Sequence, residues 1–371
     1  MKLLFAGDFV PHHRISELFK NNDFSALVQI SKITNNADYS IVNLEAPIVR
    51  DNASPIFKTG PNLKCDESAM AALKYAGFNC VTLANNHFYD YGDIGVKNTL
   101  DLCIANDIDY IGGGINLSEA KKTLYKNIQN KKIAFINCCE QEWSIATPNT
   151  GGSAPLDIIN LYYQITTERK NNDYVILIIH GGTEEYNNPT PRMKKLYRFF
   201  IDLGVDCIIN HHQHCLCGYE IYKDKPIFYG LGNFCFDWEG KQNSSWNQGY
   251  MVLLNIDENI SFNLIPYEQC SSTPFIKILN DKEKLSFLKE IESLNKIIDN
   301  DELLDSKFQE LVMNRQKNIL LNLEPFNNIR IIKKLKELKI IPYSLTKSKK
   351  ALLLNLIRCD AHKDILLKIL N

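Results

Sequence analysis

INHHQHC, residues 209–215, holds three histidines within four positions and continues the apolar run VDCIIN of residues 205–210. The run has the length and composition of a buried strand. The whole chain has only 8 histidines, so this segment concentrates them. In an extended or turning chain His212 and His214 share a face, so two imidazoles can reach neighbouring metal ions. The segment therefore predicts a metal site at the end of a strand.

Similar apolar runs recur through the first two thirds of the chain. They are apolar on both faces, as strands inside a sheet are. The runs cover residues 2–7, 39–44, 78–84, 132–138 and 174–180. Helical patterns lie between them, for example at 66–77 and 89–107. This alternation predicts an α/β fold.

The pattern changes after the histidine segment. Residues 219–230 and 249–268 have the alternation of two hairpins, which predicts antiparallel strands and hence mixed sheets. The following residues are rich in Lys, Leu, Ile and Asn, and 326–340 have helical spacing. We therefore predict a domain at 1–270 and a helical C-terminal extension at 271–371.

Composition limits the classes of function. The 371 residues are 45% hydrophobic with a net charge of -1, which predicts a globular chain and gives no general reason to expect nucleic acid. Residues 311–371 hold 13 Lys and Arg against 4 Asp and Glu. That segment could dock on an anionic partner, although lysine-rich helical faces are usually solvated surface.

The cysteines and apolar segments bear on the cellular compartment. There are 11 cysteines, an odd number, without a C-x-x-C pair, which favours a reducing compartment. The opening MKLLFAG is too short for the apolar core of a signal peptide, and no segment is long enough to span a membrane. We therefore predict a cytoplasmic protein. Cys215 and Cys217 are expected to be buried thiols rather than ligands.

Metal-binding or proton-transferring side chains follow each predicted strand. In an open α/β sheet the carboxyl ends of parallel strands line one edge, so these groups can converge. Carboxylate and amide oxygens combined with imidazoles suit divalent Mn, Fe, Zn or Mg. The groups are Asp8, Asn43, Glu45, Asn85, Asn86, His87, His180, His211, His212 and His214.

Each of these residues has an ordinary alternative when taken alone. Asp8 could be a turn or N-cap residue. His180 could be a hydrogen-bonded histidine, and His12 and His13 are expected in a solvated loop. The recurrence of such groups at successive strand ends is what favours one shared metal site.

The motifs resemble a known family. GDFVPH (7–12), VNLEAPI (42–48), TLANNHFYDYG (82–92), HGGTEEY (180–186), INHHQHC and KPIFYGLGNFCFD (225–237) are similar, in the same order, to motifs of the CapA family of poly-gamma-glutamate capsule proteins. The resemblance covers residues 1 to about 268. It implies a calcineurin-like metallophosphoesterase fold, an α/β sandwich, binding one or two divalent ions.

The resemblance also implies roles for particular residues. One ion would be held by Asp8, Glu45 and His214. A second would be held by Glu45, Asn86, His180 and His212. His87 would stand off the metals as a catalytic acid.

Four further residues are predicted to support the site. Asn43, Asn85 and Glu184 would orient ligands or substrate. Arg192 opens a predicted helix and could bind an anionic substrate, or it could be a solvated residue at the helix start.

The chain departs from the family pattern at two places. The superfamily begins D-x-H, whereas this chain has Val10 at the histidine position, so the first ion lacks one ligand. His12 or His13 could replace it. The usual H-P-H is His212-Gln213-His214 here, which keeps the spacing of the imidazoles. Many members of the family also carry an N-terminal membrane anchor that this sequence does not show.

Two functions follow as hypotheses. The first is a metal-dependent hydrolase that cleaves a phosphoester, or an amide-linked polymer, with a metal-activated water in the metabolism of capsule, poly-gamma-glutamate or another polymer. The second is a non-catalytic factor that binds capsule polyglutamate or presents it for assembly. Both predict an anionic small-molecule or polymer partner and no specific nucleic acid.

Overall fold

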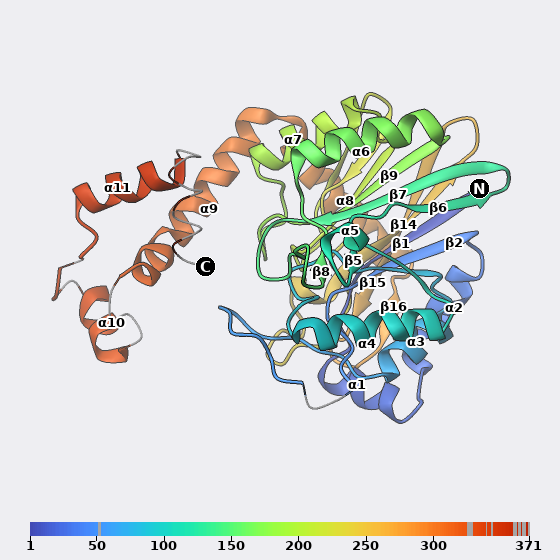
Figure 1. Ribbon diagram of the computed structural model, residues 1–371, viewed down its shortest axis with the longest axis horizontal. Coiled ribbons are helices and arrows are strands. Elements are labelled where there is room, and N and C mark those ends of the chain that lie inside the picture. Colours follow the sequence, from blue (N-terminus) through green and yellow to red (C-terminus); the bar gives the residue numbers. More distant parts are fainter. Residues whose placement is uncertain are drawn as a thin grey trace. The chain divides into compact units, whose positions relative to one another are not determined.

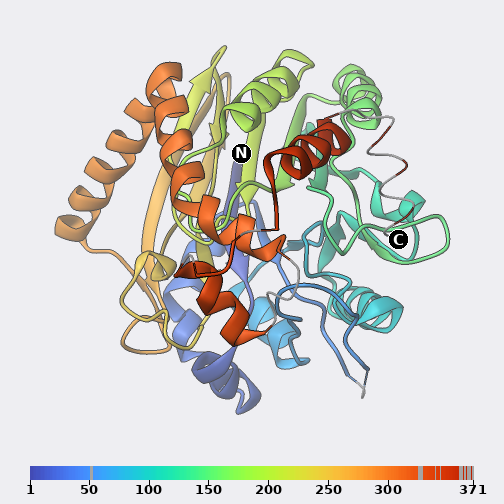
Figure 2. The same ribbon diagram turned by 90° about the vertical axis from the view of Figure 1, so that its left-hand side faces the viewer.

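Two facing β-sheets, covered by helices on their outer faces, form the centre of the larger part of the molecule (Figure 1). Figure 2 shows the same layers from the side, with green helices above the strands and blue helices below them. The computed structural model describes the chain except residues 51–52, 325–328, 339, 343, 359–361, 363–364, 366–368 and 370–371.

The first sheet has the order β16-β15-β14-β1-β2-β3-β4, and β13 also pairs with β1. Strands β1 to β4 are parallel, whereas β14 is antiparallel to β1. The bounds are β1 Lys2–Phe9, β2 Tyr39–Leu44, β3 Cys80–Thr82, β4 Asp109–Ile111, β13 Asn233–Cys235, β14 Gln248–Ile256, β15 Ile260–Gln269 and β16 Ile276–Ile278.

The second sheet has the order β11-β12-β10-β9-β7-β6. Its four central strands are parallel, and the two edge strands are antiparallel to their neighbours. The bounds are β6 Leu124–Ile128, β7 Lys131–Cys139, β9 Tyr174–His180, β10 Cys207–His211, β11 Tyr219–Tyr222 and β12 Lys225–Phe228. A separate short pair is β5 Gly113–Gly114 with β8 Gly152–Ser153.

Helices cover the outer faces, with α6 and α7 on one side and α3 and α4 on the other (Figure 1). Apolar side chains of the two sheets, such as Phe5 and Ile178, form a common buried cluster. The bounds are α1 His13–Lys20, α2 Val28–Thr34, α3 Ser68–Ala76, α4 Gly92–Ala105, α5 Leu117–Ala120, α6 Ile158–Asn171, α7 Pro191–Asp202, α8 Asp281–Asp299, α9 Asp301–Asn322, α10 Arg330–Glu337 and α11 Lys347–Arg358, with 3₁₀ turns at Ser25–Leu27 and Ser245–Asn247.

Local sequence explains how several of these helices begin and end. Helix α3 ends before Gly77, whose φ of 81° is a left-handed conformation that glycine adopts readily. Helix α7 begins with Pro191 at its first turn, and the Thr190 side chain accepts a hydrogen bond from the Met193 backbone.

The predicted fold class is confirmed: the chain is α/β with mixed sheets and has helices at its C-terminal end. The predicted strand at 78–84 is shorter, Cys80–Thr82, because the next residues turn into the loop that carries Asn85 and Asn86. The predicted helix at 326–340 contains α10, although residues 325–328 and 339 lie outside the described part.

The chain divides into two compact units, Met1–Asp305 and Ser306–Asn371. The division at residues 270 and 271 stays a prediction. Helix α8 belongs to the first unit, and its side chains Phe287 and Ile291 join the cluster between the sheets.

The sequence also led us to predict buried thiols at Cys215 and Cys217 and no segment long enough to span a membrane. Cys215 and Cys217 are buried free thiols, as are the other eight cysteines of the described residues, while Cys359 lies outside them. Within the described chain, every helix is too short or too polar to cross a membrane.

Candidate metal centre

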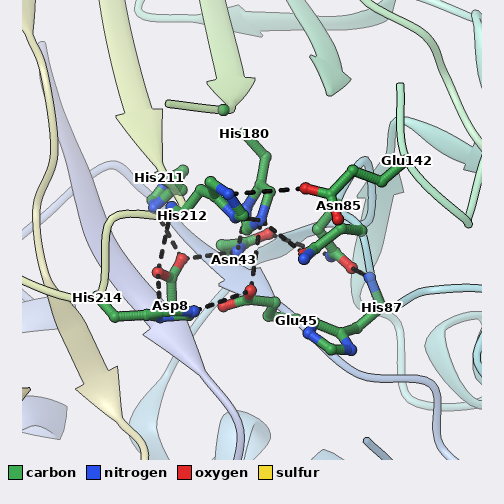
Figure 3. Close-up of polar contacts among 12 residues, drawn as sticks. Asp8, Asn43, Glu45, Asn85, His87, Glu142, His180, His211, His212 and His214 are labelled. Atoms are coloured by element: carbon green, nitrogen blue, oxygen red, sulfur yellow. Dashed lines mark hydrogen bonds and ion pairs between the residues drawn. The ribbon is translucent and has the colours of Figure 1, made fainter. Parts of the chain in front are cut away.

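The carboxyl ends of β1, β2, β9 and β10 bring the candidate residues together at one edge (Figure 3). The register of the parallel strands places Asp8 of β1 opposite Asn43 of β2. It also places His180 of β9 opposite His211 of β10. Residues that are far apart in the sequence therefore meet because the strands that carry them end at the same level.

Three candidate ligand atoms surround Nε2 of His180. Asn86 Oδ1 lies 3.0 Å away, His212 Nδ1 3.1 Å away and Glu45 Oε1 3.3 Å away. One ring nitrogen carries at most one proton, so hydrogen bonding cannot satisfy all three neighbours at once. Ligand atoms that each lie about 2.0–2.2 Å from one ion are about 3 Å from each other, so this spacing fits a shared cation.

A second group of ligand atoms comes from Asp8, Glu45 and His214, all of which are buried. His214 Nδ1 lies 3.6 Å from Asp8 Oδ2, and His214 Nε2 lies 3.6 Å from Glu45 Oε1. Asn233 Oδ1 is 2.9 Å from Nδ1, while the Asn233 amide nitrogen donates to the His214 carbonyl. Nδ1 of His214 thus has Asn233 as its acceptor, and Nε2 is the nitrogen left to interact with Glu45.

Both carboxylate oxygens of Glu45 are buried and accept no hydrogen bond among the described residues. A buried carboxylate without such a partner is costly, which is the observation that best fits a cation between the two groups. Burial raises the pKa of Glu45 well above its usual value, although nearby His214 opposes the rise. The donor set of this chain therefore fits one or two divalent ions.

The pKa values divide the histidines into two kinds. Burial and the adjacent His212 hold the pKa of His180 well below its usual value, and burial and His214 lower the pKa of His212 to about 3. Both rings are therefore neutral at pH 7, the state that binds metals. Burial alone would lower the pKa of His214, but Glu45 and Asp8 raise it to about 10.

Asp8 stays ionised in spite of its burial. Burial alone would raise the pKa of Asp8, but hydrogen bonding to His211 and His214 holds it well below the usual value. His211 Nδ1 lies 3.3 Å from Asp8 Oδ1. His211 was part of the predicted cluster but had no predicted role, and it contacts the carboxylate of the first ligand group.

The backbone of the histidine segment is strained. His212 has a φ of 99° and His214 a φ of 55°. Non-glycine residues rarely adopt such angles, and each costs about 1–3 kcal/mol, so they persist where the surroundings require them. With this backbone, His214 faces Asp8 and Glu45, and His212 faces His180 and Glu142.

Asn43 contacts two predicted ligands, Asn85 holds the backbone next to them, and both are buried. Asn43 Nδ2 donates to Asp8 Oδ1 at 2.7 Å and lies 3.3 Å from His180 Nδ1. Asn85 Nδ2 donates to the Leu44 carbonyl at 2.9 Å, and Asn85 Oδ1 accepts from the His87 backbone at 3.1 Å. Such contacts fix the orientation of metal-binding side chains.

His87 stands apart from the His180–His212 pair in Figure 3. Its Nδ1 lies 2.7 Å from Asp90 Oδ2, and Lys58 is paired with Oδ1 of the same carboxylate. Burial lowers the pKa of His87, although Asp90 opposes the shift. Neither Lys58 nor Asp90 was predicted: Asp90 lies three residues after His87, the spacing of one helical turn, but no local pattern points to Lys58.

Glu142 is a further neighbour of His212 that was not predicted. Its Oε1 lies 3.7 Å from His212 Nε2 (Figure 3). Burial raises the pKa of Glu142. Glu142 lies shortly after the predicted strand at 132–138, just as Asp8 follows the predicted strand at 2–7.

Of the remaining predicted residues, Glu184 lies near the candidate ligands and Arg192 does not. Glu184 has a carboxylate oxygen within 4.8 Å of ring nitrogens of His212 and His214. Arg192 is 64% exposed and pairs with Glu140 rather than with any predicted ligand.

The two histidines suggested as replacements at Val10 lie elsewhere. His12 stacks on Trp238 at a ring distance of 5.3 Å, and His13 is exposed. Neither belongs to a candidate ligand group in the part of the chain that the structure describes.

Taken together, the fold and the site define an α/β protein with a buried histidine and carboxylate centre at the carboxyl edge of its sheets. The model of the family "Bacterial capsule synthesis protein PGA_cap" matches residues 2–238. The chain belongs to this family, and the resemblance to CapA proteins is thereby confirmed.

Two relatives carry the CapA name. The chain is 32% identical over 246 residues to the capsule biosynthesis protein CapA of Bacillus anthracis, covering 64% of this chain and 60% of that protein. It is 31% identical over 237 residues to the PGA biosynthesis protein CapA of Bacillus subtilis strain 168, covering 63% and 62%. The chain thus spans about three fifths of the length of these relatives.

A solved structure is also similar. The 5′-nucleotidase precursor from Thermus thermophilus has a TM-score of 0.42 and 9% identity, covering 80% of this chain and 59% of that one.

Proposed function

We propose that this protein is a metal-dependent hydrolase that acts on a phosphoester in the metabolism of poly-gamma-glutamate capsule or a related polymer. The proposed ligands are Asp8, Glu45, Asn86, His180, His212 and His214. The observation that supports the proposal most strongly is the meeting of Asn86, Glu45 and His212 within 3.3 Å of His180 Nε2. Divalent ions held by such groups activate water and polarise phosphoester oxygens.

The other side chains have supporting roles in this proposal. Asn43 holds Asp8 in position, and Asn85 holds the backbone next to Glu45, through the hydrogen bonds described above. His87 is the proposed group that exchanges a proton with the leaving oxygen. The contact of Nδ1 with Asp90 leaves Nε2 for that exchange, and general acid catalysis of this kind contributes about 10²–10⁴ in rate.

Two further observations support a capsule polymer as partner and a cytoplasmic location. The names of the two CapA relatives concern capsule and PGA biosynthesis, which supports an anionic polymer as substrate or partner. The free thiols of the ten described cysteines support a cytoplasmic location. Fractionation of cells that express the natural gene tests the location directly.

The test of hydrolysis uses the purified chain. Bound metal is measured, and hydrolysis of bis(p-nitrophenyl) phosphate is followed with and without Mn²⁺. We expect metal-dependent turnover that His87→Ala lowers about 10²- to 10⁴-fold in kcat without changing the metal content. The exposed His13→Ala is the matched control.

The same material tests the alternative of a non-catalytic polymer-binding factor. Absence of turnover on phosphodiesters and on polyglutamate, with tight polyglutamate binding that His87→Ala and His212→Ala leave unchanged, would replace the hydrolase by that alternative. Absence of bound metal in protein refolded with Mn²⁺ would reject the metal centre itself.

A further inference from the structure

The turn after strand β9 is fixed against the histidine segment. The Glu185 backbone N–H donates to the Gln213 carbonyl at 2.8 Å. Gly182 has a φ of 117°, and a Cβ there would lie 2.7 Å from Gln213 Nε2, so only glycine allows this approach. The turn therefore holds Glu184 next to the residues on either side of Gln213, which are His212 and His214.

We propose that Glu184, His212 and His214 form an outer binding position for a divalent ion. One carboxylate oxygen of Glu184 and one ring nitrogen of each histidine lie within 4.8 Å of each other. Two imidazoles and one carboxylate are the ligand set of many divalent sites that keep a position open. The inference rests on the proposed function in that it takes this edge to be a metal centre.

The outer position uses Nε2 of His212, the ring nitrogen that does not face His180. Nδ1 of His212 faces His180, whereas Nε2 lies toward Glu142, 3.7 Å from its carboxylate. A neutral imidazole has one lone pair, so His212 binds an outer ion at Nε2 while Nδ1 carries the proton, and it binds ions at both nitrogens only after that proton is lost. His214 has no such division, because Nδ1 contacts Asn233 and Nε2 faces Glu45. The outer ion competes with the inner group for His214 and is the more weakly bound.

The solvent exposure of Glu184 suits the outer position to exchange ions with solvent. Glu184 is exposed, whereas Asp8, Glu45 and the histidines are buried. Glu184 is therefore more accessible to a hydrated ion than the inner ligands are. In this arrangement the outer position captures ions for the inner groups and exchanges them with solvent.

The neighbouring residue provides a matched control. Glu185 pairs with Lys241 and is held through its backbone to Gln213, and no candidate ligand group of the described residues contains it. Glu184→Gln and Glu185→Gln remove one carboxylate each from the same turn. A general effect of charge near the site would lower metal affinity in both variants, whereas loss of a ligand lowers it in the first alone.

The experiment is titration of the metal-free full chain with Mn²⁺, followed by calorimetry and by the electron paramagnetic resonance of free Mn²⁺. We expect Glu184→Gln to remove the weakest Mn²⁺ equivalent or to weaken it at least tenfold, and Glu185→Gln to match the unchanged protein. Crystals with Mn²⁺ should show an anomalous peak in contact with the Glu184 carboxylate. Equal stoichiometry and affinities in both variants, or no peak at Glu184, would overturn the proposal.

Failure of the outer position can be distinguished from failure of the proposed hydrolase activity. If Glu184→Gln loses the weakest Mn²⁺ equivalent, Glu185→Gln keeps it and no ester is cleaved, the outer position stands while the hydrolase fails. If esters are cleaved and Glu184→Gln titrates like the unchanged protein, the hydrolase stands while the outer position fails.

Discussion

Nε2 of His180 and Nδ1 of His212 lie 3.1 Å apart, at a ring-centroid distance of 4.8 Å. Two neutral imidazoles that turn nitrogens toward one point are arranged for a shared cation. Loss of a residue that is only hydrogen-bonded to a metal ligand weakens metal binding ~10- to 100-fold. We expect His212→Ala, which removes a ligand itself, to weaken Mn²⁺ binding by more than that. Calorimetric titration measures it, with His13→Ala as control. Unchanged affinity would contradict a shared ion.

Acid sensitivity of the metal-free protein follows from the same pair. In the unfolded chain His212 takes up a proton below about pH 6.5, but in the fold burial lowers its pKa to about 3. The unfolded state therefore binds more protons in this window, and the free energy of unfolding falls by about 1.4 kcal/mol per pH unit as the pH decreases. His180 adds a loss of the same sign, because its pKa is also lowered.

The variant His212→Asn isolates this contribution. It removes one titrating group, so the slope of unfolding free energy against pH between about 3 and 6.5 should decrease by about one proton. Urea unfolding at several pH values with chelator present measures both slopes. A variant with the slope of the unchanged protein would show that His212 is protonated equally in both states.

A buried ion pair beside His87 predicts a large loss of stability. The side chain of Lys58 is 2% exposed and that of its partner Asp90 is 0% exposed. Lys58→Met leaves a buried carboxylate without its cation, which costs about 3–5 kcal/mol. Lys20→Met, at an exposed ion pair with Glu17, should cost less than about 1 kcal/mol.

The double variant tests the cause of that loss. Lys58→Met with Asp90→Asn has no uncompensated charge, so it should be more stable than Lys58→Met alone. Chemical denaturation of the unchanged protein, the two single variants and the double variant gives the coupling free energy. Simple addition of the two single losses would mean that the pair contributes through packing and not through charge.

The strands were predictable wherever an apolar run is buried on both faces. Strands β2 and β9 have the predicted bounds of 39–44 and 174–180. The three-residue strand β13 was missed, because its pairing with β1 depends on contacts more than 200 residues apart that leave no local pattern. Short segments of this kind are strands only through their neighbours.

The candidate site was predictable to the extent that it lies at strand ends. Asp8, Asn43 and His180 occupy ends that the sheet register brings to one edge. Lys58 comes from a loop, and its approach to Asp90 depends on the path of that loop, to which no periodicity points. The positive φ of His212 was equally unpredictable, because the surrounding structure holds the residue at this angle and local sequence preference does not favour it.

The extent of the folded core predicts where the chain can be shortened. Helix α8 contributes Phe287, Ile291, Leu294 and Ile298 to the buried clusters. Burying such side chains contributes about 1.5–3 kcal/mol each, and their joint removal approaches the about 5–15 kcal/mol by which whole domains are stable.

A chain that ends at Thr273 should therefore unfold or aggregate, whereas one that ends at Asp305 keeps the complete first unit and should fold. Near-ultraviolet circular dichroism and urea unfolding distinguish the two, and Mn²⁺ titration reports whether the metal centre is intact. We expect residues 1–305 to bind Mn²⁺ as the full chain does, because all candidate ligands lie in that unit. A stable, metal-binding protein that ends at Thr273 would show that α8 is dispensable for the fold and would favour the domain end predicted at residue 270.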